Sequence, residues 1–111
     1  ECVTIIHVVD LASSHVAAID HVRKLKPFEA LNIGTGSGLS VMQMVHEFEI
    51  QSGSRIMYEF AALRPGDAAK VWADASKAKE KIGFQAGLGA PEMCRDTWRW
   101  QSANPSGYQK A

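Results

Sequence analysis

The chain has 111 residues, of which 46% are hydrophobic and 22% are charged, and its 12 Lys and Arg residues balance 12 Asp and Glu residues. These values predict one small globular domain with a modest core. The zero net charge argues against a nucleic-acid or anionic-membrane surface, which would carry a basic excess, and no apolar run approaches the roughly 20 residues of a membrane span.

Cysteine use and the first residues add two expectations. Cys2 and Cys94 lie far apart and offer neither a disulfide framework nor a zinc ligand set. We therefore expect a reducing, cytoplasmic setting, with no signal peptide. The sequence begins with Glu1 in an apolar stretch without a preceding turn, which is typical of a fragment of a longer chain.

The first quarter of the chain predicts a strand followed by a helix. Residues 1–6 are apolar and β-branched, as in a short strand. The next apolar residues recur at the three-and-four spacing of a helix face, and Pro27 is predicted to end the helix. That face comprises Val8, Leu11, Ala12, His15, Val16, Ile19 and Val22. His15 is therefore expected to pack in the core.

The next segment predicts strand, helix, strand. Residues 28–33 form a short apolar strand pattern, and residues 55–60 alternate as a second strand does. Between them, Ser40 and Gln43 make a capping box for a helix that Gly53 ends. This order predicts a right-handed crossover that joins two parallel strands.

The second half predicts a turn and two helices. Pro65-Gly66 is a strong turn signal, and the turn holds Arg64 and Asp67. A charged helix is expected over residues 76–82, ended by Gly83, and a final helix over residues 91–101 begins with Pro91. In that last helix Cys94 lies on the apolar face, while Trp100 lies elsewhere and is free to pack against a neighbouring segment.

The turn is the first candidate for chemistry. The Arg64 guanidinium can grip phosphate oxygens in a bidentate way, and the Asp67 carboxylate can accept hydrogen bonds from sugar hydroxyls. Such a pair is a plausible grip on a nucleotide-sugar. The alternative, which these residues alone favour, is a surface turn with an exposed ion pair.

The glycine-rich loop at residues 34–38 is a weaker candidate. It follows a predicted strand and opens a helix, but Leu39 stands where a dinucleotide fingerprint needs Gly or Ala and where a P-loop needs Lys. We expect a tight turn that lets the backbone approach a ligand. The four histidines lack metal-ligand spacing, and neither Tyr58 nor Tyr108 is followed by Lys four residues later, so no catalytic residue, metal site or cofactor site is expected on this chain.

Several motifs together resemble one family. They are Ile6-His-Val-Val-Asp-Leu-Ala12, residues 31–41 (Leu-Asn-Ile-Gly-Thr-Gly-Ser-Gly-Leu-Ser-Val), Arg64-Pro-Gly-Asp67, Trp72-Ala-Asp-Ala-Ser-Lys-Ala78 and Asp96-Thr-Trp-Arg-Trp-Gln-Ser102, followed by Asn104-Pro-Ser-Gly-Tyr108. Their order and spacing resemble the C-terminal part of the UDP-glucose 4-epimerase family, within the extended short-chain dehydrogenase/reductase group. The resemblance covers nearly the whole chain.

This resemblance implies a two-part enzyme. An N-terminal Rossmann part would hold NAD and the catalytic Tyr and Lys, and a smaller C-terminal part would close over the UDP-sugar. Residues 1–111 would form a single C-terminal substrate-binding domain of the α/β class, with short strands and flanking helices, and without the Rossmann part. The expected partners are the UDP-sugar, the Rossmann part and a second copy in a homodimer, and we expect the chain alone to be inactive.

The resemblance also assigns roles to four residues. Arg64 would hold the UDP diphosphate, Asp67 would bind a ribose hydroxyl, and Val41 would line the nucleotide pocket. Val71 matches the position that sets the room around the sugar C2 substituent, where a bulky Tyr excludes N-acetylated sugars. Because valine is small, we expect a pocket tolerant of UDP-N-acetylhexosamines.

The sequence departs from the family at three positions and leaves two other functions open. Val3, Thr4 and Ile5 stand where the family has Arg-Asp-Tyr, so a phosphate ligand is missing and nucleotide affinity should be reduced. A sugar-nucleotide dehydratase or decarboxylase of the same group could share the Arg64 turn. A non-catalytic, degenerate module that binds a partner through the face once covered by the Rossmann part is the third hypothesis.

Overall fold

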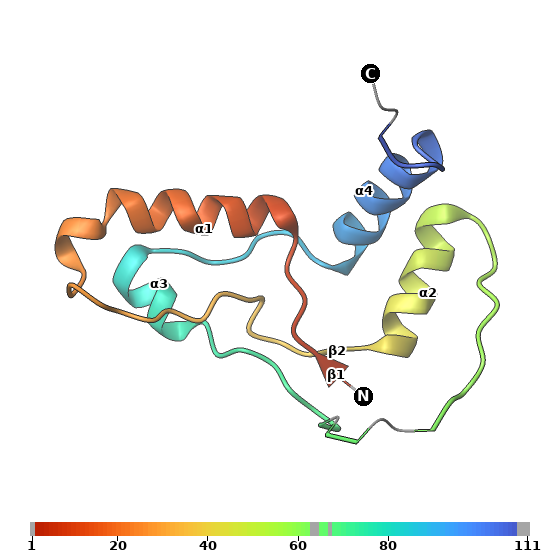
Figure 1. Ribbon diagram of the computed structural model, residues 1–111, viewed down its shortest axis with the longest axis horizontal. Coiled ribbons are helices and arrows are strands. Elements are labelled where there is room, and N and C mark those ends of the chain that lie inside the picture. The colour runs from red at the N-terminus through yellow and green to blue at the C-terminus, as the bar shows by residue number, and fades with distance from the viewer. Residues whose placement is uncertain (1, 63–64, 67, 109–111) are drawn as a thin grey trace.

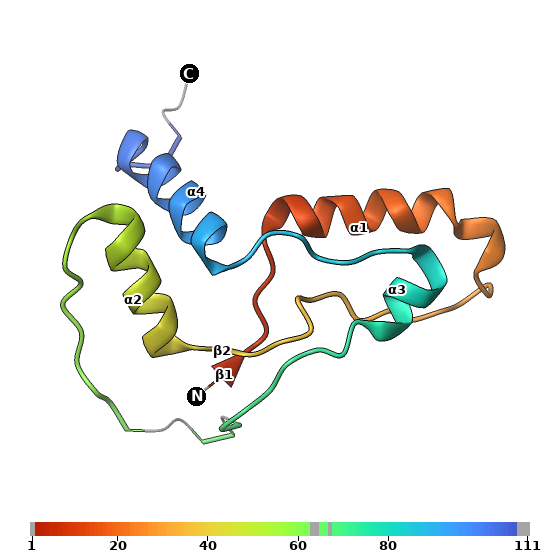
Figure 2. The same cartoon turned by 180° about the vertical axis from the view of Figure 1, so that it is seen from behind.

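Helices dominate the computed structural model, which describes residues 2–62, 65–66 and 68–108. The helices are α1 (Val8–Asp20), the short 3₁₀ helix η1 (Val22–Lys24), α2 (Val41–Ser52), α3 (Ser76–Ile82) and α4 (Ala90–Ala103), and the strands are β1 (Cys2–Val3) and β2 (Leu39–Ser40). In Figures 1 and 2, α1 and α3 lie together at one end of the molecule and α2 and α4 at the other, with the two strands between the pairs. The mixed helix and strand content agrees with the predicted α/β class.

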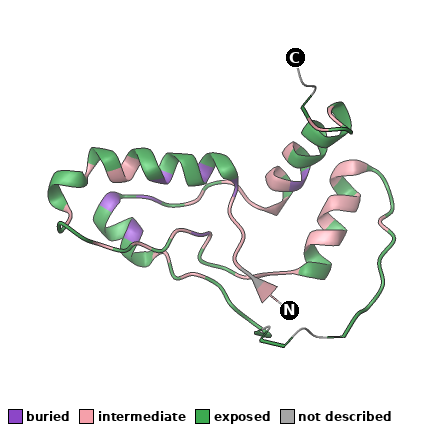
Figure 3. Ribbon diagram, viewed as in Figure 1, coloured by how far each residue is buried: buried purple, intermediate pink, exposed green. Residues whose placement is uncertain are grey.

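The interior of the chain is small for its length. The radius of gyration is 17.0 Å, whereas a compact domain of this length has about 13 Å. The main core cluster consists of Ala78 and Ile82 from α3 together with Phe84, against which half-buried side chains of α1 and the 31–33 segment pack. Figure 3 shows few buried positions, most of them where α1, α3 and the following segment meet. Most large apolar side chains therefore lie at the surface.

The predicted helix ends are confirmed where local capping chemistry decides them. The Ser40 hydroxyl accepts a hydrogen bond from the Gln43 N–H at 3.1 Å, and the Gln43 side chain accepts one from the Ser40 N–H at 2.9 Å. Gly53 and Gly83 end α2 and α3 in the left-handed conformation, with φ of 67° and 66°. Pro91 lies in the first turn of α4, as its fixed φ favours.

Helix α1 differs from its prediction in two ways. It ends at Asp20 rather than near Pro27, because His21 leaves the helical conformation and its ring nitrogen lies 2.9 Å from the Ala17 carbonyl oxygen, which it caps. The predicted apolar face points to solvent: Val8 is 71% and Ile19 is 70% exposed. The expectation that His15 packs in the core is therefore wrong, since the side chain is exposed.

The two predicted central strands are also wrong. Residues 28–33 and 55–60 are not in strands, and the paired strands β1 and β2 run antiparallel, so the parallel crossover is not formed. A strand needs a neighbour for its backbone hydrogen bonds, and these segments find none within the described part of the chain. Their side chains remain uncovered, with Phe28 88%, Met57 91% and Phe60 86% exposed.

Candidate functional site

Strand β1 joins two segments that carry predicted site residues. On one side it pairs with β2, with Cys2 opposite Ser40. On the other side, the Cys2 N–H donates to the Ala69 carbonyl at 3.0 Å, and the Val71 N–H donates to the Cys2 carbonyl at 2.9 Å. The start of α2, where Val41 lies, and the end of the Arg64 turn segment, where Val71 lies, are thus held on opposite sides of one strand.

Val41 opens α2 at the edge of a hollow. This hollow, of about 320 Å³, is lined by side chains of α2, including Val41 and Met42, and by residues 58–61. Tyr58 and Phe60 meet edge to face across 5.7 Å, at 88°. An apolar wall with aromatic rings suits a planar ring system such as a nucleobase. Sequence reasoning did not identify Tyr58 and Phe60 as site residues, although their alternation within the 55–60 pattern was the available signal.

Val71 is 56% exposed, and the segment after it packs against the glycine-rich loop. A Cβ atom on Gly38 would lie 2.7 Å from the Trp72 ring, and one on Gly34 would lie 3.0 Å from the Thr4 methyl carbon. These two glycines leave room for side chains of the chain itself to approach the loop. The expectation that the loop lets the backbone approach a ligand stays a prediction.

Two of the predicted site residues, Arg64 and Asp67, lie outside the described residues. Between them, Gly66 has a φ of 90°, which agrees with the predicted turn, since only glycine adopts this conformation easily. The structure thus brings Val41 and Val71 to the two sides of β1 and leaves the predicted Arg64–Asp67 grip as a prediction. The side chain of Val3 also lies outside the description.

Thr4 joins the N-terminal segment to the segment after Val71. Its hydroxyl accepts a hydrogen bond from the Ala73 N–H at 2.6 Å.

A second polar cluster lies between α1 and α4. The His7 side chain is only 6% exposed; its Nδ1 accepts from the Val9 N–H at 3.1 Å, and its Nε2 lies 3.2 Å from the Asp96 carboxylate. Because Nδ1 is an acceptor, the ring proton resides on Nε2, which donates to Asp96. The Arg95 side chain, which hydrogen-bonds to Asp96, holds the pKa of that carboxyl below its ordinary value, with a smaller contribution from His7.

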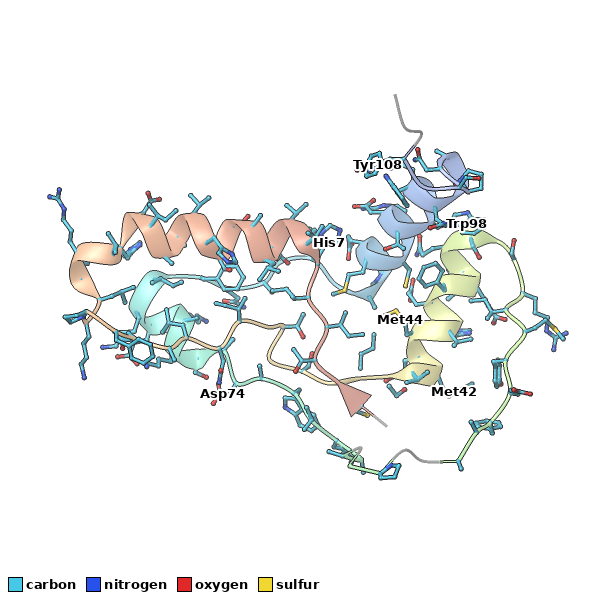
Figure 4. All side chains as sticks on the ribbon, viewed as in Figure 1. His7, Met42, Met44, Asp74, Trp98 and Tyr108 are labelled. Atoms are coloured by element: carbon cyan, nitrogen blue, oxygen red, sulfur yellow. The ribbon has the colours of Figure 1, made fainter. Side chains whose placement is uncertain are left out.

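His7 and Asp96 border an apolar groove between α2 and α4. The groove, of about 560 Å³, is lined by Met44, Phe48, Cys94 and Trp100 among others. Figure 4 shows His7 at the start of α1 near α4, and Met44 on the side of α2 that faces α4. Burial raises the pKa of the Cys94 thiol, so this cysteine is a packing residue rather than a nucleophile.

Trp100, near the end of α4, contacts a segment that follows the helix. Trp100 packs edge to face on Tyr108, with ring centroids 5.6 Å apart, which confirms that it contacts a neighbouring segment. Over residues 2–62, 65–66 and 68–108, no three His, Cys, Asp or Glu side chains gather as a metal site would require. In the same residues, no helix has the length and apolarity needed to cross a membrane.

Several known proteins that are similar to this chain are named UDP-glucose 4-epimerase. No protein-family model matches the sequence. The chain is 51% identical over 106 residues to a UDP-glucose 4-epimerase of Bacillus subtilis, a match that covers 96% of this chain and 31% of the relative. It is 48% identical over 103 residues to a UDP-glucose 4-epimerase of Homo sapiens, with 93% of this chain and 30% of the relative covered.

Solved structures give the same result. A UDP-glucose 4-epimerase from Bifidobacterium longum, in complex with NAD+ and UDP, superposes with a TM-score of 0.83 at 42% identity over 95% of this chain. Another UDP-glucose 4-epimerase structure superposes with a TM-score of 0.90 at 30% identity over 98% of this chain. The chain spans about 30% of the length of these relatives. By sequence and by fold, the chain is therefore homologous to the C-terminal part of the UDP-glucose 4-epimerases.

Proposed function

We propose that this chain is the UDP-sugar-binding portion of an enzyme that interconverts UDP-glucose and UDP-galactose, and that it works with an NAD-binding Rossmann part. The observation that carries the proposal is the pairing of β1 with both β2 and residues 69–71. It gathers the start of α2 and the segment after the Arg64 turn into one place. The related B. longum structure, described as a complex with NAD+ and UDP, supports these ligand classes.

Each site residue has a role in this proposal. Arg64 binds the diphosphate through a bidentate, charge-assisted contact, and Asp67 accepts a hydrogen bond from a ribose hydroxyl. Val41, at the mouth of the aromatic hollow, packs against the nucleoside. Val71 sets the room beside the sugar, and its own backbone N–H donates to the Cys2 carbonyl.

The chemistry of the reaction lies outside this chain. Bound by the Rossmann part, NAD would supply the hydride chemistry needed at the sugar C4. The residues described here bind and orient the nucleotide, so that the sugar is free to turn while its diphosphate stays anchored. The sequence holds no Tyr-x-x-x-Lys pair, and we therefore expect the isolated chain to be inactive.

Calorimetric titration with UDP and UDP-galactose tests the nucleotide grip. We expect saturable binding to the chain that the substitution Arg64→Ala abolishes. Arg23→Ala is the matched control, because it removes an exposed arginine of η1, remote from β1 in sequence. Equal binding by the wild-type and Arg64→Ala chains would refute the assigned grip. Absence of binding up to millimolar UDP would show that the isolated chain is not a working nucleotide site.

Substrate range tests the role of Val71. In a polypeptide that joins this chain to the N-terminal part of the B. subtilis relative, we expect turnover of both UDP-galactose and UDP-N-acetylgalactosamine. Val71→Tyr should selectively remove the second activity, since the larger ring fills the space of the N-acetyl group. A relative from Campylobacter jejuni, described as a UDP-Glc/GlcNAc 4-epimerase, superposes with a TM-score of 0.82 at 28% identity, which supports dual specificity within this fold. Activity on UDP-galactose alone in the unsubstituted polypeptide would contradict the proposal.

One alternative keeps some support from this sequence. Val3 replaces the arginine expected at a phosphate contact, and this replacement is the observation that supports a non-catalytic binding module. A dehydratase or decarboxylase has less support, because the relatives reported above carry epimerase names.

For the epimerase we also propose a cytoplasmic setting and a homodimer. Size-exclusion chromatography of the joined polypeptide tests the latter.

A further inference from the structure

The indole ring of Trp72 covers one glycine of the 34–38 loop. A Cβ atom on Gly38 would lie 2.7 Å from Cε3 and 3.3 Å from Cδ2 of this ring. A contact below 3.0 Å forces one of the two groups to shift, so the ring can lie where it does only because residue 38 is glycine. Both ring atoms are on the side of the indole next to Cγ, and the contact is therefore close to the backbone of Trp72.

The backbone on both sides of Trp72 is tied to the N-terminal segment. The Val71 N–H donates to the Cys2 carbonyl at 2.9 Å, and the Ala73 N–H donates to the Thr4 hydroxyl at 2.6 Å. The ring adds a third contact, to the loop that leads into β2. The position of residues 71–73 thus depends on three contacts with segments that are distant in the sequence.

Val71 and Trp72 face opposite ways in this arrangement. Lys70 pairs with Cys2 in a parallel bridge, so the segment is extended where it meets β1. Successive side chains of an extended segment point to opposite sides. Since the Trp72 ring packs on the loop, Val71 points away from the loop, and its side chain is 56% exposed. A push on the ring therefore reaches Val71 through the backbone, without any change in the groups around the valine itself.

We infer that Gly38 and Trp72 form a positioning pair that sets the place of Val71 and with it the range of UDP-sugars accepted, an inference that rests on the proposed function. A methyl group on residue 38 would have to push the ring from 2.7 Å to the ordinary contact range of 3.4–4 Å, a shift of roughly 1 Å, and a misplacement of this size can change a rate about 100-fold. The ring is 50% exposed, so it has room to move without unfolding the chain.

Substrate discrimination tests the pair in the polypeptide that joins this chain to the N-terminal part of the B. subtilis relative. We expect Gly38→Ala to change kcat/KM for UDP-N-acetylgalactosamine about tenfold relative to UDP-galactose, because the larger C2 substituent is the one that reaches Val71. Adding Trp72→Phe to Gly38→Ala should restore the ratio, since phenylalanine has no atom equivalent to Cε3. Gly87→Ala is the matched control, because a Cβ atom there meets nothing within 4 Å.

Amide resonances test the same pair without substrate or activity. In the chain of residues 1–111, Gly38→Ala should move the ¹H–¹⁵N resonances of Val71 and Ala73, and the added Trp72→Phe should return them toward their original positions. The amides of Gln101 and Ser102 are the internal control. They lie at the end of α4 that Figure 1 shows away from the strands, and should not move.

Each outcome has a defined meaning. Unmoved Val71 and Ala73 amides in the Gly38→Ala chain would overturn the inference, as would an unchanged ratio in a polypeptide that turns over both substrates. Loss of UDP binding by Trp72→Phe alone would make the ring a ligand contact and would also overturn it. A polypeptide that turns over neither substrate, or UDP-galactose alone, contradicts the proposed function instead, and the resonances then decide whether the pair positions Val71.

Discussion

Removal of the Asp10 carboxylate should loosen the segment that follows α3. Asp10 is 9% exposed, and one of its oxygens accepts from both Gly87 and Leu88. A hydrogen bond to a charged group contributes about 1.5–3 kcal/mol. Since the two hydrogen bonds share one oxygen, we expect Asp10→Ala to destabilise the segment that follows α3 by about 2 kcal/mol. This loss is smaller than the sum expected for two separate hydrogen bonds. Asp10→Asn keeps a neutral acceptor and should cost about half as much.

Amide hydrogen exchange measures this effect where it occurs. A loss of about 2 kcal/mol in local opening free energy corresponds to roughly 30-fold faster exchange of the Gly87 and Leu88 amides. The amides of α2, which Asp10 does not contact, provide the internal control and should keep their rates. Exchange of Leu88 within about twofold of the wild-type rate in the Asp10→Ala chain would refute the claim that this carboxylate holds the segment.

Substitutions at three other positions test the remaining contacts. His7→Ala should lower the free energy of unfolding by about 1–2 kcal/mol through the lost helix cap, and His7→Asn, which keeps an acceptor, should lose less; urea denaturation followed by circular dichroism measures both. The pKa of Asp96 is lowered in the folded chain, chiefly by Arg95. The ionised Asp96 carboxylate therefore stabilises the folded chain above pH 3.8, its ordinary pKa, and this stabilisation is lost as the pH falls through the lowered pKa of the folded state. Asp96→Asn should flatten this part of the acid-denaturation profile. Gly38→Ala should displace the Trp72 ring and shift tryptophan emission, at a cost of about 1 kcal/mol because the half-exposed ring can move.

Features that depend on a few neighbouring residues could be predicted from the sequence. The Ser40 capping box and the left-handed Gly83 each follow from groups within one helical turn, and both are found where expected. The turn at Gly66 belongs to the same class. The contact between His7 and Asp96 could not be predicted in this way, since it joins residues 89 positions apart. The placement of Val41 and Val71 on opposite sides of β1 likewise depends on backbone pairing between distant segments.

The errors about which faces are buried share one physical cause. The apolar pattern of α1 and the strand patterns of residues 28–33 and 55–60 correctly mark surfaces that favour burial, but a pattern does not say which element covers them. In this chain the described residues supply no cover, so Ile19 and Phe60 lie exposed and the strand patterns remain unpaired. The same absence explains why the radius of gyration exceeds that of a compact domain. The patterns therefore mark faces that favour burial, while the structure shows which of these faces the described residues leave exposed.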